Sequence, residues 1–167
     1  MKTWIAGLAA ALIALNVAAA HGPLIGRPSV IDGDTIETTC QRVRIHGVDA
    51  PESSQRCTDG RGAAYRCGRE AARALDRFLA ASRPTRCEPV DIDRYGRIVG
   101  ACFRADGASV NHWLVANGYT LDWAKYSRGA YASDQDGARA KALGIWQGRF
   151  QLPCEARAER SRQKSSC

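Results

Sequence analysis

Three short segments of the sequence carry carboxylates or arginines at strand junctions and turns, where side chains can do chemistry. Residues 30–35 place Asp32 and Asp34 on either side of a glycine, where one strand-like run gives way to another. Residues 43–52 lead from a strand into a carboxylate–proline–carboxylate turn, and residues 91–97 carry two further acids followed by arginines. Hydrolysis of a phosphodiester gathers negative charge on oxygen, which a carboxylate-bound cation and guanidinium groups stabilise. Carboxylates that can hold a cation, together with arginines, are the groups that such chemistry requires.

Each segment alone has a plain structural explanation as a turn, a strand exit or a hairpin tip. The sequence contains none of the P-loop, zinc-protease or nucleophile-elbow motifs. An EF-hand starting at Asp32 would put Ile36 and Val43 at positions that need oxygen ligands, and loops starting at Asp91 or Asp134 fail in the same way. The occurrence of all three segments together, in this order and separation, favours their being parts of one site.

Taken as a set, residues 31–35, 43–52 and 93–97 closely resemble the staphylococcal nuclease (thermonuclease-like) family, over a stretch from about residue 25 to residue 146. The resemblance implies an OB-type barrel and calcium-dependent cleavage of phosphodiester bonds in DNA and RNA. It also implies that the products carry 3′-phosphates.

The resemblance also implies roles for individual residues. Calcium would be held by Asp34, Asp49 and the backbone carbonyl of Ala50, with Asp32 as a nearby acid. Calcium is a hard ion that takes oxygen ligands in a tolerant geometry, which fits these donors. The residues that match the catalytic positions of the family are Arg44, Glu52 and Arg97. Arginine suits this task because its planar fork holds two phosphate oxygens at once.

Four further residues are candidates for substrate binding. Arg94 and Tyr95 fall where the family contacts a substrate phosphate. Trp123 and Tyr126 align ambiguously with base-stacking positions, so they either stack on bases or are partly buried core aromatics.

Length and composition fit one ordinary globular domain. The chain has 167 residues, of which 45% are hydrophobic and 25% charged, and its formal net charge is +7. The positive charge favours an anionic partner such as nucleic acid, without base specificity. No protein partner is implied.

The N-terminus has the pattern of a secretory signal. Lys2 precedes an apolar stretch over residues 4–15, and the small residues 18–20 predict cleavage after Ala20. We therefore expect an exported protein, periplasmic or secreted, without stable membrane association after cleavage. The expected organisation is a signal peptide (1–20), a nuclease domain (21–152) and a solvated, polar and basic tail (153–167).

Export makes the cysteines candidates for disulfides. Cys57 and Cys67 bracket a turn-rich loop, and Cys87 and Cys102 lie at corresponding ends of two strand-like runs, so these are the two predicted pairs. Because seven cysteines is an odd number, at least one is free or paired between chains. The pairing of three remains open: Cys40, Cys154 and Cys167.

Hydrophobic periodicity predicts the elements that position these residues. The alternating segments predict strands at 29–31, 35–38, 43–45, 85–91 and 97–104. The helical spacing of apolar residues predicts helices over 68–81, over a short segment from residue 110, and over about 133–146. This order predicts an α+β, mainly β fold: a small five-stranded OB-type β-barrel with about three helices.

Two other classes of function compete with the nuclease. The first is a catalytically inactive OB-type module that binds nucleic acid, and the second is an exported, disulfide-stapled interaction module. Both leave unexplained why the five acids and arginines of the proposed site are all intact, namely Asp34, Arg44, Asp49, Glu52 and Arg97.

Overall fold

The computed structural model describes residues 22–164 and 167. The predicted signal peptide, residues 1–20, lies outside the described residues. Among the residues described, no helix combines the length and the apolar character needed to cross a membrane.

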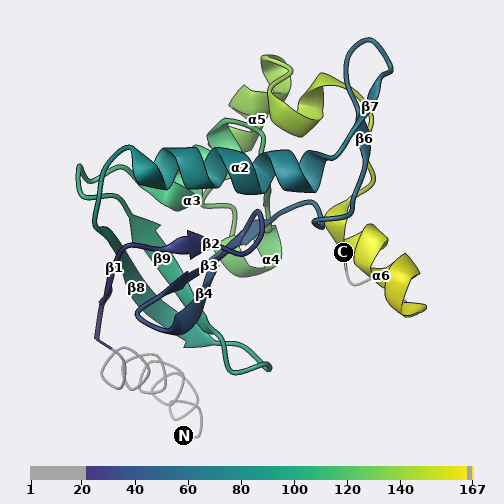
Figure 1. Cartoon of the computed structure of the whole chain (residues 1–167). Coiled ribbons are helices and arrows are strands. Elements are labelled where there is room, and N and C mark those ends of the chain that lie inside the picture. The colour runs from purple at the N-terminus through teal and green to yellow at the C-terminus, as the bar shows by residue number, and fades with distance from the viewer. Residues whose placement is uncertain (1–21, 165–166) are drawn as a thin grey trace, which may run out of the picture.

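A mixed six-stranded sheet forms the body of the fold (Figure 1). Its strands, in spatial order, are β1 (Leu24–Gly26), β8 (Thr85–Ile92), β9 (Ile98–Phe103), β4 (Gln41–Ile45), β3 (Thr35–Thr38) and β2 (Ser29–Val30). Strands β4 and β9 are parallel neighbours, whereas the other neighbours are antiparallel. The sequence predicted every one of these strands except β1, whose three residues are too few for a clear alternation.

The sheet curls, so that β1 approaches β3 although three strands separate them in the hydrogen-bonded order. At the point of approach, a Cβ atom on Gly26 would lie only 2.7 Å from Oγ1 of Thr38, so only glycine fits there. The curled sheet with helices packed on it is the α+β, OB-type fold that the sequence predicted.

Helix α2 (Cys67–Ala80) lies across the sheet, as Figure 1 shows. Its buried face carries Ala71, Ala74, Leu75 and Leu79, the helical spacing seen in the sequence. Helix α3 (Val110–Ala116) lies beside the sheet and begins at Ser109, whose hydroxyl accepts a hydrogen bond from a backbone N–H of its first turn. The core between sheet and helices contains Ile36, Val43, Ile45, Leu75, Ile98, Val110 and Leu114.

The predicted helix over 133–146 is shorter than expected. Helix α5 (Ala132–Ala140) ends early, and a separate 3₁₀ turn, η1 (Gly144–Gln147), follows it. Between them Ala142 and Gly144 have φ angles of 50° and 55°, which are incompatible with a continuous right-handed helix. A Cβ on Gly144 would lie 2.1 Å from the carbonyl oxygen of Gly118, so close backbone packing ends the helix here.

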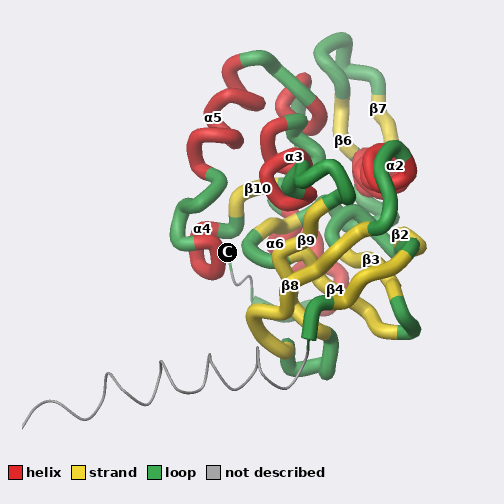
Figure 2. The backbone as a smooth tube through the Cα atoms, turned by 90° about the vertical axis from the view of Figure 1, so that its left-hand side faces the viewer, coloured by secondary structure: helices red, strands yellow, loops and turns green. Residues whose placement is uncertain are grey.

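Two short two-stranded sheets complete the fold. Strand β5 (Val48–Asp49) pairs with β10 (Leu121–Asp122), and β6 (Cys57–Thr58) pairs with β7 (Ala64–Tyr65). The single-turn helix α4 (Ala124–Ser127) follows β10 directly. In Figure 2, viewed at 90° to Figure 1, α3 and α5 lie on one side of α2 and the β6–β7 hairpin rises beside α2.

The disulfides confirm both predicted pairs. Cys57 is bonded to Cys67, and Cys87 to Cys102 across neighbouring positions of β8 and β9. A third bond joins Cys154 to Cys167, and Cys40 is free and exposed.

The described residues of the segment 153–167, which was expected to be a solvated tail, are instead built onto the domain. Residues Pro153–Ser161 form helix α6, with proline in its first turn and Glu155 accepting a hydrogen bond from the backbone N–H of Leu152 at 3.3 Å. The Cys154–Cys167 bond then ties the end of the chain back to this helix. The tail lacks an apolar stripe, so hydrophobic periodicity did not indicate the helix.

Candidate active site

Two buried aspartates, one directly before β3 and one in β5, lie close together at one end of the sheet. Asp34 lies directly before β3, and Asp49 is the second residue of β5. Each side chain is only 5% exposed. One Asp34 oxygen, Oδ2, accepts a hydrogen bond from the backbone N–H of Ala50 at 3.1 Å, and Oδ1 accepts one from the hydroxyl of Thr35 at 3.0 Å. These bonds fix the Asp34 carboxylate against the turn that follows Asp49.

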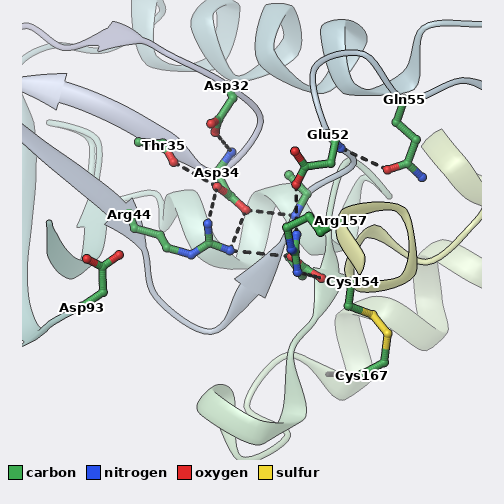
Figure 3. A network of polar contacts seen from close by, with 12 residues as sticks. Asp32, Asp34, Thr35, Arg44, Glu52, Gln55, Asp93, Cys154, Arg157 and Cys167 are labelled. Atoms are coloured by element: carbon green, nitrogen blue, oxygen red, sulfur yellow. Dashed lines mark hydrogen bonds and ion pairs between the residues drawn. A yellow bond between two sulfur atoms is a disulfide. The ribbon is translucent and has the colours of Figure 1, made fainter. Parts of the chain in front are cut away.

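Arg44 joins the two aspartates (Figure 3). Its Nη1 donates to Oδ1 of Asp34 at 3.2 Å, and its Nη2 lies 3.1 Å from Oδ2 of Asp34 and 3.6 Å from Oδ1 of Asp49. The Arg44 side chain is 18% exposed, more than the 5% of either aspartate. The sequence predicted that these three residues share a site, and the structure brings them into direct contact.

Glu52 lies three residues beyond Asp49, in a turn held by Gln55. Oε1 of Gln55 accepts from the backbone N–H of Glu52 at 3.1 Å, and its amide nitrogen donates to the carbonyl of Gln151 at 2.6 Å. The Glu52 side chain is 21% exposed and faces the same cluster. The turn thus places a third carboxylate beside the two aspartates.

Two arginines of α6, which the sequence interpretation missed, cover this cluster. Arg157 donates to both oxygens of Asp49, with Nη1 2.8 Å from Oδ1 and Nη2 3.0 Å from Oδ2, and Nη1 also lies 3.2 Å from Oε1 of Glu52. Arg160 pairs with the other oxygen of Glu52. Figure 3 shows Arg44 and Arg157 approaching the cluster from opposite sides. The acids and arginines therefore form one continuous ionic network.

Burial and mutual repulsion change the proton affinities of the acids. Burial, and then the charge of Asp34, raise the pKa of Asp32 to about 6. Burial raises the pKa of Asp49 above its ordinary value, although Arg157 opposes the change. Burial lowers the pKa of Arg157, but its bonds to Asp49 and Glu52 outweigh burial and raise it. The site thus concentrates negative charge that requires cationic partners.

The donors at this point suit a hard divalent cation. Oxygens of Asp34 and Asp49 both lie within 3.6 Å of a single nitrogen of Arg44, so the two carboxylates point at a common place. Among the described residues there is no cluster of three or more His, Cys, Asp or Glu side chains arranged around an ion. Backbone carbonyls, water and substrate oxygens would therefore have to complete the coordination.

Arg97 lies next to the strand that neighbours Arg44. It directly precedes β9, whose Val99 is opposite Arg44 on the parallel strand β4. Asp93 holds Arg97, with Nε 2.7 Å from Oδ2, and also accepts its backbone N–H at 3.0 Å. In Figure 3, Asp93 lies beyond Arg44 and away from Arg157.

A groove of about 670 Å³ opens beside Arg97. Its lining includes Arg42, Ile92 and Tyr95, and Tyr95 is 68% exposed. The Arg94 guanidinium lies 4.8 Å from the centre of the Tyr95 ring, and its Nη2 donates to the Tyr95 hydroxyl at 2.7 Å. The groove is therefore lined by arginine and aromatic groups, which suit a phosphate backbone with bases.

The two ambiguous aromatics lie outside the core. Tyr126 is 49% exposed, and Trp123 is half-buried and contacts Tyr126 edge to face, with ring centres 4.5 Å apart. The guanidiniums of Arg44 and Arg157 each lie 5.5 Å from the Trp123 ring centre. Trp123 therefore lies against two arginines of the ionic cluster, Arg44 and Arg157.

Comparison with known proteins identifies one family and several relatives. A family model described as "Staphylococcal nuclease homologue" matches residues 42–148. The chain is 52% identical over 163 residues to the succinoglycan biosynthesis protein ExoI of Rhizobium meliloti (strain 1021), an alignment that covers 98% of this chain and 85% of that protein. It is also 30% identical over 131 residues to an uncharacterized endonuclease of Escherichia coli, covering 75% of this chain and 76% of that protein. The match to the family model ends before α6, so Arg157 and Arg160 lie outside it.

Proposed function

The chain belongs to the family of staphylococcal nuclease homologues, and from that premise we propose that it is an exported, calcium-dependent nuclease that hydrolyses DNA and RNA. The observation that carries the proposal is the contact of Arg44 with both buried aspartates, Asp34 and Asp49. A domain that only binds nucleic acid has no need of two buried carboxylates, because they repel the phosphate backbone.

The metal-binding donors in this proposal are the carboxylates of Asp34 and Asp49 and the backbone carbonyl of Ala50. A calcium ion bound there would lend positive charge to a phosphate oxygen as the transition state forms. Two carboxylates and one carbonyl leave several coordination positions of such an ion free, which water and a phosphate oxygen of the substrate would fill.

Arg44 and Arg97 provide the guanidiniums that hold the phosphate in this proposal. Arg44 is already oriented by Asp34, so it donates to a phosphate oxygen without first losing side-chain freedom. Arg97 is oriented by Asp93 in the same manner. Arg44 lies on β4 and Arg97 directly precedes the parallel neighbour β9, so in this proposal they approach one phosphate from neighbouring strands.

Glu52 is the residue that acts on water. Its carboxylate orients a water molecule and accepts its proton as the water oxygen bonds to phosphorus. The bond from phosphorus to the 5′ oxygen then breaks, and that oxygen takes a proton from solvent. The phosphate remains on the 3′ side, in line with the products that the resemblance implies.

Separate observations support export and the binding of DNA and RNA. The expected signal sequence and the three disulfides favour an oxidising compartment, periplasmic or extracellular. The groove beside Arg97 and the exposed Tyr95 would bind a single strand through backbone charge and stacking, which does not distinguish sugars.

Incubation of the purified protein with plasmid DNA and with RNA, each in calcium or in excess chelator, tests the proposal. We expect cleavage of both substrates in calcium only, and 3′-phosphate ends by mass spectrometry of the products. The matched control is Glu52→Gln, which keeps the size of the side chain and removes the base. Binding of both substrates without cleavage would instead support the inactive binding module.

A further inference from the structure

Arg157 occupies carboxylate oxygens that the proposed calcium ion needs. Both oxygens of Asp49 accept hydrogen bonds from the two terminal nitrogens of Arg157, and the Asp49 side chain is 5% exposed. A guanidinium and a divalent cation at the same carboxylate repel each other at short range, in a place where water screens poorly. Calcium and Arg157 therefore compete for Asp49.

Hydrogen bonds and a disulfide fix the segment that carries Arg157, so its contact with Asp49 is not a loose surface contact. The segment leading to α6 is held by the backbone N–H of Thr58, which donates to the carbonyl of Arg149 at 2.8 Å, and by Gln55, which donates to the carbonyl of Gln151. Cys154 in the first turn of α6 is 8% exposed and disulfide-bonded. Arg157 follows one helical turn later and is aimed at the cluster.

The surroundings also provide a place for Arg157 after it leaves Asp49. Its side chain is 30% exposed and lies on the Trp123 ring, which also contacts Arg44. A small rotation would keep the guanidinium on the aromatic face and outside the ligand shell of the metal.

Resting on the proposed function, we propose that Arg157 is a displaceable counter-ion of the metal site: it neutralises Asp49 and Glu52 in the metal-free protein and must leave Asp49 when calcium binds. Helix α6 thus sets the calcium affinity of the enzyme. The apparent affinity of a ligand falls in proportion to the fraction of molecules in the binding-competent state, so releasing Arg157 strengthens calcium binding.

The test is calorimetric titration of calcium into the disulfide-intact protein, without nucleic acid. Arg157→Gln should bind calcium about tenfold more tightly than the parent, as expected if about a tenth of parent molecules have Arg157 displaced. The matched control is Arg162→Gln, which removes the same charge near the end of α6. Arg162 is exposed, and within the described part of the chain its side chain forms no ion pair. It should match the parent within about twofold, since only a screened surface charge is lost.

A second variant and a second readout guard against misfolding. Arg157→Lys keeps the charge and loses the two-point bond, so its calcium affinity should lie between those of the parent and Arg157→Gln. In chelator, Arg157→Gln should melt below the parent because buried Asp49 loses its two-point partner and keeps only the 3.6 Å contact with Arg44, and calcium should raise its Tm more than that of the parent.

The outcomes separate this inference from the proposed function. Equal or weaker calcium binding by folded Arg157→Gln, compared with Arg162→Gln, overturns the counter-ion role and leaves the nuclease proposal standing. If neither the parent nor the variant binds calcium and both cleave DNA in chelator, the calcium assignment itself is wrong and the inference falls with it.

Discussion

Arg44 and Asp34 form a two-point ion pair across the β3–β4 hairpin, with Nη1 3.2 Å from Oδ1 and Nη2 3.1 Å from Oδ2. The carbonyl of Asp34 also accepts the backbone N–H of Ile45 at 2.8 Å, so backbone and side chain are both fixed. The pair couples a predicted metal ligand to a predicted phosphate-binding residue. A substitution of Arg44 therefore affects the orientation of the Asp34 carboxylate as well as the charge of the site.

Arg44→Lys should lower kcat by about a hundredfold or more, the loss seen when one oriented donor is removed from a comparable electrostatic site. Lysine keeps the charge beside Asp34 but cannot make the two-point bond, so its ammonium is less well placed at the phosphate. Steady-state kinetics on a single-stranded oligonucleotide, with the melting temperature as a check on folding, measures the effect.

Arg86→Lys is the matched control, because Arg86 lies on β8 of the same sheet, outside the groove, with a 53% exposed side chain that pairs with Glu88. It should retain kcat near that of the parent. Near-parental kcat in Arg44→Lys would remove Arg44 from the catalytic set.

Asp93→Asn should loosen Arg97 and lower kcat about tenfold, since Asn keeps the turn but loses the ionic bond to the guanidinium. Asp91→Asn is the control: Asp91 is exposed, and its side chain accepts from the backbone N–H of Ile92. An unchanged kcat in Asp93→Asn, with Arg97→Lys impaired, would show that Arg97 acts without Asp93.

The ion pair between Asp93 and Arg97 predicts how the stability of the protein depends on pH. Burial raises the pKa of Asp93, but bonds from Arg97 and from two backbone N–H groups outweigh it, so the folded pKa lies below the ordinary value of 3.8. A lowered pKa in the folded state stabilises the protein above the unfolded pKa, and this contribution is lost as pH falls through the folded pKa. Urea unfolding should show the parent more stable than Asp93→Asn at neutral pH, with the difference shrinking below about pH 4. A difference that stays constant down to strong acid would contradict the ionic account.

The cysteines predict a labelling pattern for the exported protein. Under denaturing, non-reducing conditions one equivalent of iodoacetamide should react, at Cys40, because the other six cysteines are bonded. Cys40→Ser should abolish the label. Intact mass should also show a chain that begins after Ala20, as the signal motif predicts. Labelling at Cys154, or a mature chain that still begins at Met1, would contradict the third bond or the export respectively.

What the sequence predicted depended on local pattern or on the family's motifs. Helix α2 and the strands beside Arg44 follow from periodicity, because each buries one face against a single core. Cys57 and Cys67 lie only ten residues apart across a turn, so their pairing could also be predicted from the local sequence. These elements are decided by neighbours in sequence.

The parts that sequence reasoning missed depend on contacts between distant segments. Arg157 meets Asp49 across 108 residues, and α6 has no apolar stripe that would mark it as packed. Two local signals did point to it: good helix formers follow Pro153, and Cys154 and Cys167 bracket them. The end of α5 was missed for a related reason, because it is caused by the approach of Gly144 to Gly118.

Calcium dependence of cleavage is the central claim, and one titration tests it most directly. The initial rate of cleavage of a single-stranded oligonucleotide is followed as free calcium rises from a chelated level to millimolar, for the parent and for Asp49→Asn. Loss of one of two carboxylate ligands should weaken the metal site. The parent rate should rise from background to a plateau, and the Asp49→Asn curve should be shifted to higher calcium with a lower plateau. A parent rate that is already maximal in chelator, and that does not change as calcium rises, would contradict the account.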